Sequence, residues 1–257
     1  MKLRILSDLH LEGYKFTYIP QDEDVVLLLG DIHTQNRHSV ILDQIPASKK
    51  VIMISGNHEY YGQTFENVDS VLTDLEDVYP NFTYLNNSSV DIDNISFFGG
   101  CMWSNFQLYG IVQESQARAE AKHFIADYKY IDKFASYPNY TGIKEKWTIN
   151  DTIEQYELFN KEFDRWVKDA EGKTRICLSH FLPSEKSVSP QFANSVLNAY
   201  FCSNQEHRIQ LVDYWLHGHT HSSANYKIGD STVICNPHGY GRENVNEFDP
   251  NLIIEVL

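Results

Sequence analysis

Five short apolar runs, each followed closely by aspartate, asparagine or histidine, constrain the fold of this chain more than any other feature. The runs are residues 3–6, 25–29, 51–54, 175–178 and 214–216. Apolar runs of this length are typical of strands that are buried on both faces of a sheet. The polar residues then lie at the carboxyl ends of the strands, where the loops of an α/β sheet converge and ligands bind. The pattern therefore predicts a single site built from five loops.

The residues that follow these runs have side chains that bind metals. They are Asp8, His10, Asp31, Asn57, His180, His219 and His221. Carboxylate, imidazole and amide groups suit divalent ions such as manganese, iron(II) and zinc. No cysteine is among them, which argues against a purely structural zinc site. Each motif is weak alone, but five of them in this order predict functional metal binding.

The rest of the pattern alternates helices with further strands. Apolar residues at helical spacing predict a helix from Val68 to Val78 that stops before Pro80. A second helix is expected to begin at a capping box over 151–154 and to end near Gly172. Further strands are expected at residues 82–85, 95–98, 224–228, 232–235 and 252–256. This order predicts an α/β fold.

The length of 257 residues fits one domain over residues 1–257, with an insertion at about 104–147. That segment is rich in tyrosine and contains a predicted helix at 117–125. Two interpretations of it stay open: a cap over the site, or an ordinary surface insertion.

Charge and composition limit the partners of the chain. A formal net charge of −14 repels a phosphate backbone, so we expect no stable nucleic-acid partner, while divalent cations are attracted. Neither a signal peptide nor a membrane span is expected, because no long apolar stretch is present. Four widely spaced cysteines predict reduced, buried thiols rather than disulfides. These features favour a cytoplasmic enzyme that has no membrane partner.

The motifs resemble those of the calcineurin-like metallophosphoesterases. The resembling segments are Asp8-Leu9-His10, Gly30-Asp31, Gly56-Asn57-His58-Glu59, His180 and Gly218-His219-Thr220-His221. Residues 100–103 and 233–240 also resemble a bacterial and phage-type branch of that family. The resemblance implies a four-layer α-β-β-α sandwich, in which two mixed β-sheets are flanked by helices.

The resemblance also implies two ligand sets that share Asp31. One ion would be held by Asp8, His10, Asp31 and His221, and the other by Asp31, Asn57, His180 and His219. The ions, manganese, iron or zinc, would activate a bridging hydroxide that attacks phosphorus in line. His58, which is not needed as a ligand, would protonate the leaving oxygen. The alternative is that His58 is a loop residue packed beside the site.

One departure from the family pattern concerns the partner of His58. Many members carry an aspartate three residues after the bridging one, and here that position is Thr34. Two alternatives follow: Glu59 assists His58, or His58 acts without a carboxylate partner.

Several residues outside the motifs have weaker expectations attached to them. His33, His238 and Arg242 are candidates for substrate binding, although His33 could equally donate a hydrogen bond behind the site and Arg242 could be a surface residue. We expect His38, His123 and His207 to face solvent, His217 to lie behind the site or pack in the core, and Trp103 to pack in the core.

The sequence thus predicts a dinuclear metal-dependent hydrolase of a small phosphate ester, either a diester or a monoester, such as a nucleotide. A non-catalytic scaffold of the same fold, a nuclease and a protein phosphatase are the alternatives. The presence of all seven ligands and of His58 favours an enzyme.

Overall fold

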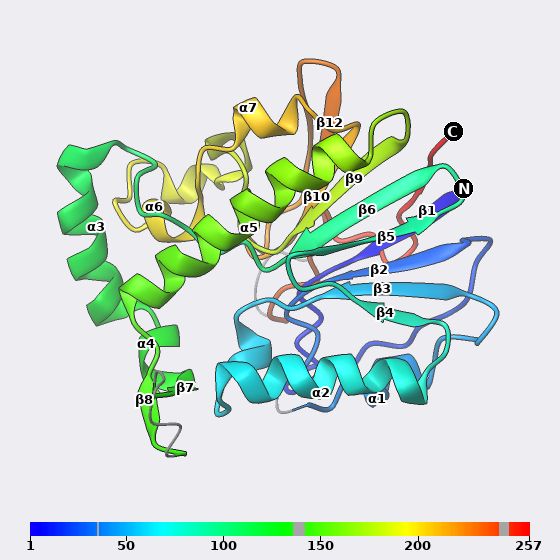
Figure 1. Ribbon diagram of the computed structural model, residues 1–257, viewed down its shortest axis with the longest axis horizontal. Coiled ribbons are helices and arrows are strands. Elements are labelled where there is room, and N and C mark those ends of the chain that lie inside the picture. Colours follow the sequence, from blue (N-terminus) through cyan, green and yellow to red (C-terminus); the bar gives the residue numbers. More distant parts are fainter. Residues whose placement is uncertain (35, 136–141, 242–246) are drawn as a thin grey trace.

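Two mixed β-sheets lie at the centre of the computed structural model, which describes residues 1–34, 36–135, 142–241 and 247–257 (Figure 1). The first sheet has the strand order β13 (Ile253–Glu255), β1 (Lys2–Leu6), β2 (Val25–Leu29), β3 (Lys50–Ile54) and β4 (Phe82–Tyr84). The second has the order β11 (Ala224–Ile228), β12 (Ser231–Cys235), β10 (Tyr214–His217), β9 (Thr174–Ser179), β6 (Ile95–Gly100) and β5 (Ser88–Ile92). The inner strands are parallel, whereas β13, β11 and β5 are antiparallel edge strands.

The apolar runs are continuous because both faces of the inner strands are covered. In β2, Leu27 belongs to an apolar cluster made only of residues from the sheets and their flanking segments. Its neighbours Val26 and Leu28 belong to a second cluster, which includes helix residues such as Val68 and Phe163. Successive side chains of a strand point to opposite faces, so a strand between two cores has no polar face.

Helices cover the outer faces of the two sheets. The α-helices are α1 (Ser39–Leu42), α2 (Phe65–Val78), α3 (Ile111–Phe124), α4 (Asp127–Tyr130), α5 (Ile149–Asp169), α6 (Asn198–Phe201) and α7 (Glu206–Ile209). Helices α1 and α2 lie along the first sheet, and α5 crosses the second (Figure 1). The indole nitrogen of Trp166 in α5 donates a hydrogen bond of 2.8 Å to Ser96 Oγ in β6. This arrangement confirms the predicted four-layer α-β-β-α sandwich.

The start of α5 corrects one prediction. The capping box is formed by Thr148 and Asp151, so the helix begins at Ile149 rather than at the box expected over 151–154. Asp151 is the third residue of the helix, because Thr148 already supplies the capping side chain.

Strand β5 was not predicted from the sequence. Most of its side chains are exposed and polar, as is typical of an edge strand, so it has no apolar run.

The segment over 104–147 contains α3, α4 and the hairpin of β7 (Asp132–Phe134) and β8 (Lys144–Lys146). In Figure 1 these elements lie together at one end of the molecule. The role of the segment as a cap stays a prediction, as does the description of residues 1–257 as one domain.

Other side chains settle smaller expectations. All four cysteines are buried and free, and Trp103 is buried in the core, as predicted.

The described residues also contain three short 3-10 helices in the loops after β3 and β9. They are η1 (His58–Tyr60), η2 (Glu185–Ser187) and η3 (Pro190–Phe192). Within the described ranges, no helix combines the length and apolar character needed to cross a membrane.

Candidate metal centre

The predicted ligands meet where strands of both sheets end. Asp8 and His10 follow β1, Asp31 follows β2, Asn57 follows β3, His180 follows β9, and His219 and His221 follow β10. Within the described chain, ligand atoms of six of them, together with His58, form three overlapping groups whose members lie within 4.8 Å of one another. The groups are Asp8 with His10 and His221, His10 with Asp31 and His58, and Asp31 with His180 and His219.

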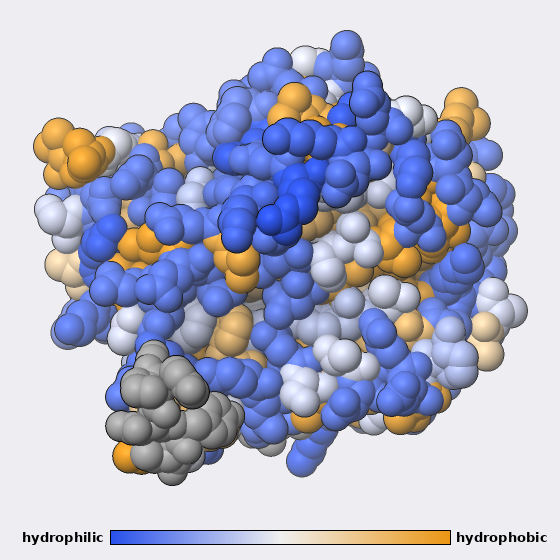
Figure 2. Space-filling view, viewed as in Figure 1, coloured by the Kyte–Doolittle hydropathy of each residue, from blue (hydrophilic) through white to orange (hydrophobic). Residues whose placement is uncertain are grey.

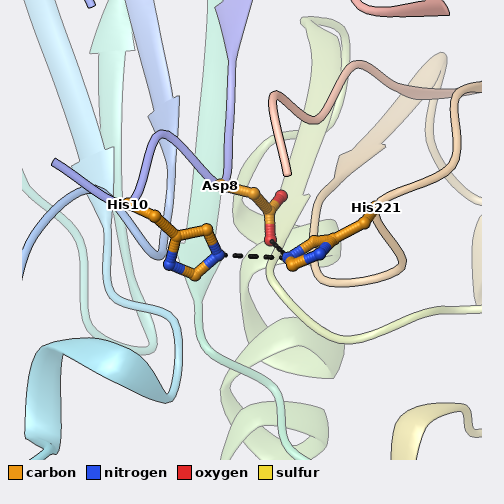
Figure 3. A group of neighbouring side chains, drawn as sticks. All are labelled: Asp8, His10 and His221. Carbon is orange, nitrogen blue, oxygen red and sulfur yellow. Dashed lines mark hydrogen bonds and ion pairs between the residues drawn. The ribbon is translucent and has the colours of Figure 1, made fainter. Parts of the chain in front are cut away.

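The first group joins the β1 loop of one sheet to the β10 loop of the other (Figure 3). His10 Nε2 lies 3.1 Å from His221 Nε2, which lies 3.5 Å from Asp8 Oδ1. His10 Nδ1 lies 3.1 Å from Glu12 Oε1. A hydrogen bond from Nδ1 to this carboxylate leaves the Nε2 lone pair directed towards the group, as is usual for a metal-binding histidine.

The second group centres on Asp31 and His180. His180 Nδ1 lies 2.8 Å from the carbonyl oxygen of Leu29, and its Nε2 lies 3.3 Å from Asp31 Oδ2. Burial opposes protonation of His180, but the carboxylates of Asp31 and Asp8 raise its pKa to about 9. The site therefore stabilises positive charge between the imidazole and the carboxylate. A cation bound there would supply that charge.

Three ligand atoms lack a hydrogen-bond partner among the described residues although they are buried. They are Asn57 Oδ1, His180 Nε2 and His219 Nε2. Leaving a buried polar atom unpaired costs roughly 1–3 kcal/mol, so such atoms are rare in native proteins. The amide of Asn57 is held by a 2.9 Å hydrogen bond from its Nδ2 to Asp127 Oδ1, which leaves Oδ1 as the free acceptor. The three unpaired ligand atoms are therefore suited to bind a metal ion.

The backbone at the site adopts an uncommon conformation. Five of the seven predicted ligands have a φ between 46° and 73°, namely Asp8, His10, Asp31, His219 and His221. This left-handed region is unfavourable for residues with a Cβ atom and is concentrated at functional sites. The loops thus hold these side chains in place at the expense of local backbone stability.

Two glycines of the motifs are required because the loops that contain them approach each other closely. Gly30 has a φ of +85°, and a Cβ atom on it would lie 2.5 Å from the backbone nitrogen of Gly56. A Cβ atom on Gly56 would overlap Asp31 Oδ1. The two loops can therefore bring Asp31 and Asn57 together only if both positions lack a side chain.

Glu59 holds these two loops together and does not assist His58. Its Oε2 accepts hydrogen bonds from the backbone nitrogens of Asp31 (2.9 Å) and Gly56 (2.7 Å), and Oε1 accepts one from Ile32 (2.7 Å). His38 Nε2 lies 3.4 Å from the same carboxylate, and His38 is fully buried. The expectation that His38 faces solvent is therefore wrong, because this histidine packs against a buried acid.

The carboxylate beside His58 is Glu12, which the sequence did not reveal. Glu12 Oε1 lies 3.6 Å from His58 Nδ1 and also contacts His10. Burial opposes protonation of His58, but Asp31, Glu12 and Asp127 raise its pKa to about 9. Glu12 lies two residues after His10, and a carboxylate so close to a ligand is the signal that could have identified it.

A cavity of about 770 Å³ adjoins the ligands. Asp31, Asn57 and His58 form part of its wall, and residues 124–127 and parts of 182–201 form much of the rest. Asp127 in this wall accepts hydrogen bonds from Tyr61 and Tyr200 as well as from Asn57. Asp127 was not predicted, because nothing in the local sequence relates it to Asn57.

Two of the weaker candidates, His33 and His238, lie away from this cavity. His33 is buried, with Nδ1 against the carbonyl oxygen of Thr34, and His238 packs beside Phe16 and Phe248. Neither of them lines the cavity. Arg242 falls outside the described residues, so substrate binding by all three stays a prediction.

His217, on β10, is buried beside the centre. Its Nε2 forms a 2.8 Å hydrogen bond with Ser187 Oγ. Its burial agrees with the expectation that His217 lies behind the site or packs in the core, and both of these alternatives stay open.

Two helix-flanked mixed sheets with metal-binding side chains at their strand ends define a metallo-dependent phosphatase fold. The chain belongs to the calcineurin-like phosphoesterase family, whose model matches residues 1–223.

Similarity to individual proteins agrees with this assignment. Protein L509 of Acanthamoeba polyphaga mimivirus is 28% identical over 287 residues, covering 99% of this chain and 96% of that protein. The crystal structure of a phosphopantetheinyl hydrolase from Mycobacterium tuberculosis has a TM-score of 0.70 at 14% identity and covers 94% of this chain and 90% of that one. A putative 5′-nucleotidase from Staphylococcus aureus has a TM-score of 0.51 at 10% identity, and the match covers 91% of this chain and 48% of that one. The two structures support the fold.

Proposed function

We propose that this protein hydrolyses small phosphate esters with the help of two divalent ions. The observation that carries the proposal is the convergence of seven ligands from both sheets, three of which have a buried ligand atom without a hydrogen-bond partner. The cavity of about 770 Å³ also supports a small substrate, since pockets for small organic molecules have volumes of roughly 300–1,000 Å³.

In this proposal, Asp31 belongs to both ligand sets. Asp8, His10, Asp31 and His221 would hold one ion, and Asp31, Asn57, His180 and His219 the other. In support, Asp31 Oδ2 lies 3.9 Å from His10 Nε2 in the first set and 3.3 Å from His180 Nε2 in the second. Manganese, iron or zinc suits these nitrogen and oxygen donors. When bound, the ions would lower the pKa of water and offset charge on the phosphoryl oxygens.

His58 is proposed as the proton donor. Hydrolysis forms a P–O bond from water and breaks the ester P–O bond, so the departing oxygen needs a proton. His58 lines the cavity, and its Nε2 lies 4.0 Å from Asp31 Oδ2 and 3.2 Å from the Tyr240 hydroxyl. Glu12 lies on the opposite side of the ring, where it orients Nδ1. His58 thus stands between the ligands and the space for the substrate.

A reconstitution experiment tests the activity. The metal-free protein is supplied separately with Mn, Fe(II), Zn, Ni and Co, and turnover of a generic aryl phosphodiester and a generic aryl phosphomonoester is measured. We expect turnover of at least one ester with at least one of these metals. If no ester is turned over with any of the metals, the proposal that this protein is an enzyme is rejected and the non-catalytic scaffold is favoured.

Two variants separate metal binding from proton transfer. Asp31→Asn is expected to lose metal and nearly all activity, because the shared carboxylate is gone. His58→Ala is expected to keep both ions and to lose roughly 10²–10⁴-fold in kcat. Metal content and kcat are measured for both, with His207→Ala as the control at an exposed histidine. If His58→Ala turns over as fast as the parent, His58 is not the proton donor.

A further inference from the structure

The cavity beside the ligands extends well beyond the space that a phosphate group fills. Its outer part lies between the end of α3 and the segment that follows β9. Apolar side chains from both segments line it, among them Phe124, Ile125, Val188, Phe192, Leu197 and Phe201. Phe124 and Phe192 are 65% and 53% exposed, although aromatic side chains of this size usually bury more of their surface. Exposed apolar residues that border a pocket indicate a surface meant to be covered.

The charges in this wall disfavour an anionic ligand. Among the described residues that line the cavity, none is lysine or arginine. The acidic residues Asp127 and Glu247 lie in the wall, and its other polar members include the neutral Ser189, Gln191 and Asn198. A second phosphate or a carboxylate on the substrate would meet like charge from Asp127 and Glu247, and no lysine or arginine among the described wall residues offsets it.

We infer that the cavity binds an uncharged, largely apolar organic arm attached to the phosphorus of a phosphodiester substrate. The inference rests on the proposed function, because the arm is placed by the phosphate at the ligands. Asp31, Asn57 and His58 belong to the same cavity wall as Phe192 and Leu197, so one molecule can occupy both parts. The preferred substrate is then a lipid-like or aromatic phosphodiester rather than a nucleoside polyphosphate.

Three p-nitrophenyl phosphodiesters test this inference, because they share one leaving group and differ only in the second arm. The arms are methyl, hexyl and 5-carboxypentyl, the last two being of similar length but different charge. With the manganese-loaded protein, we expect kcat/KM for the hexyl ester to exceed that for the methyl ester by at least about tenfold. The carboxypentyl ester is expected to fall below the hexyl ester by about tenfold.

Variants at exposed positions locate the effect in the cavity without disturbing the core. The double variant Phe124→Ala/Phe192→Ala should lower kcat/KM about tenfold for the hexyl ester and less than about twofold for the methyl ester. The matched control is Ile111→Ala/Val112→Ala, at the opposite end of α3, where the side chains are 79% and 87% exposed and do not line the cavity. Figure 2 shows hydrophilic residues over most of one face and an apolar cluster at the end of the molecule where α3 lies.

Adding a cation provides a test in the opposite direction. Gln191→Lys places a positive charge at an exposed position of the wall and should raise kcat/KM for the carboxypentyl ester relative to the hexyl ester.

The outcomes separate this inference from the function it rests on. Equal kcat/KM for the three arms, a preference for the carboxypentyl arm, or a hexyl preference that survives the double alanine variant would overturn the inference. Hydrolysis of the aryl monoester without hydrolysis of any diester would overturn it too, while leaving the phosphoesterase activity in place. Absence of turnover with every ester and metal would reject the proposed function itself.

Discussion

At the scale of single residues, Glu12 joins two parts of the proposed chemistry. One oxygen, Oε1, lies 3.1 Å from His10 Nδ1 and 3.6 Å from His58 Nδ1. Burial would raise the pKa of Glu12, but its hydrogen bond with His10 and the nearby imidazole of His58 hold the pKa well below its usual range. The carboxylate therefore stays charged and lies where it would orient a proposed metal ligand, His10, and the proposed proton donor, His58, in place of the aspartate that many family members carry at the position of Thr34.

Replacing Glu12 by glutamine tests this positioning. The amide oxygen of Glu12→Gln can still accept one hydrogen bond but carries no charge, so we expect kcat to fall about tenfold while both ions are retained. Glu12→Ala should also weaken metal affinity, by about 10- to 100-fold. Metal content and kcat are compared with Asp22→Asn, which removes a charge at an exposed surface site. An unchanged kcat in Glu12→Gln would show that His58 is oriented by something else.

At the scale of elements, α4 connects the segment over 104–147 to the candidate metal centre. Its first residue, Asp127, is buried and accepts a 2.9 Å hydrogen bond from Asn57 Nδ2. Tyr61 and Tyr200 donate to the same carboxylate, so three elements fix its position. A helix outside the five motifs thus determines which atom of the Asn57 amide faces the site.

Asp127→Asn is expected to weaken the binding of the ion assigned to Asn57. The amide keeps only one acceptor oxygen, whereas the carboxylate accepts from Asn57, Tyr61 and Tyr200, so the support of Asn57 is weakened. Loss of a partner behind a ligand typically lowers metal affinity by about 10- to 100-fold. Calorimetric titration with manganese measures the affinity of each ion. The control Asp132→Asn removes the acid of a partly exposed ion pair with Lys146, and little change in either affinity is expected. If the affinity of Asp127→Asn for both manganese ions equals that of the parent, the role given to α4 is wrong.

At the scale of the whole molecule, the candidate ligands come from both sheets of the sandwich. The first sheet supplies Asp8, His10, Asp31 and Asn57, and the second supplies His180, His219 and His221. Two ions at this place would link the sheets at one edge of their shared core. Because the ligand atoms converge only when both sheets are packed, metal binding should stabilise the folded state.

Removing the metal should therefore destabilise the protein. A ligand present at 100 times its Kd adds about 2.7 kcal/mol, which for a chain of this size corresponds to a rise in Tm of roughly 5–10 °C. We expect a chelator to lower Tm by at least this amount and manganese to restore it, as measured by circular dichroism. Asp31→Asn should show no response to the chelator. An identical Tm with and without metal would argue against two ions bound between the sheets.

The sequence by itself predicted most of the strands, the candidate ligands at their ends and an α/β fold, and its resemblance to a known family implied the α-β-β-α class. Strand periodicity and ligand chemistry are properties of short segments, so runs such as Val25–Leu29 followed by Asp31 can be read without knowing their neighbours. Only the tertiary structure decided that Glu12 stands beside His58, that Asp127 orients Asn57, and that an apolar cavity opens beside the ligands. These contacts join residues far apart in the chain, Asn57 and Asp127 being separated by 70 positions, and such pairs leave no periodic or spacing signal in the sequence.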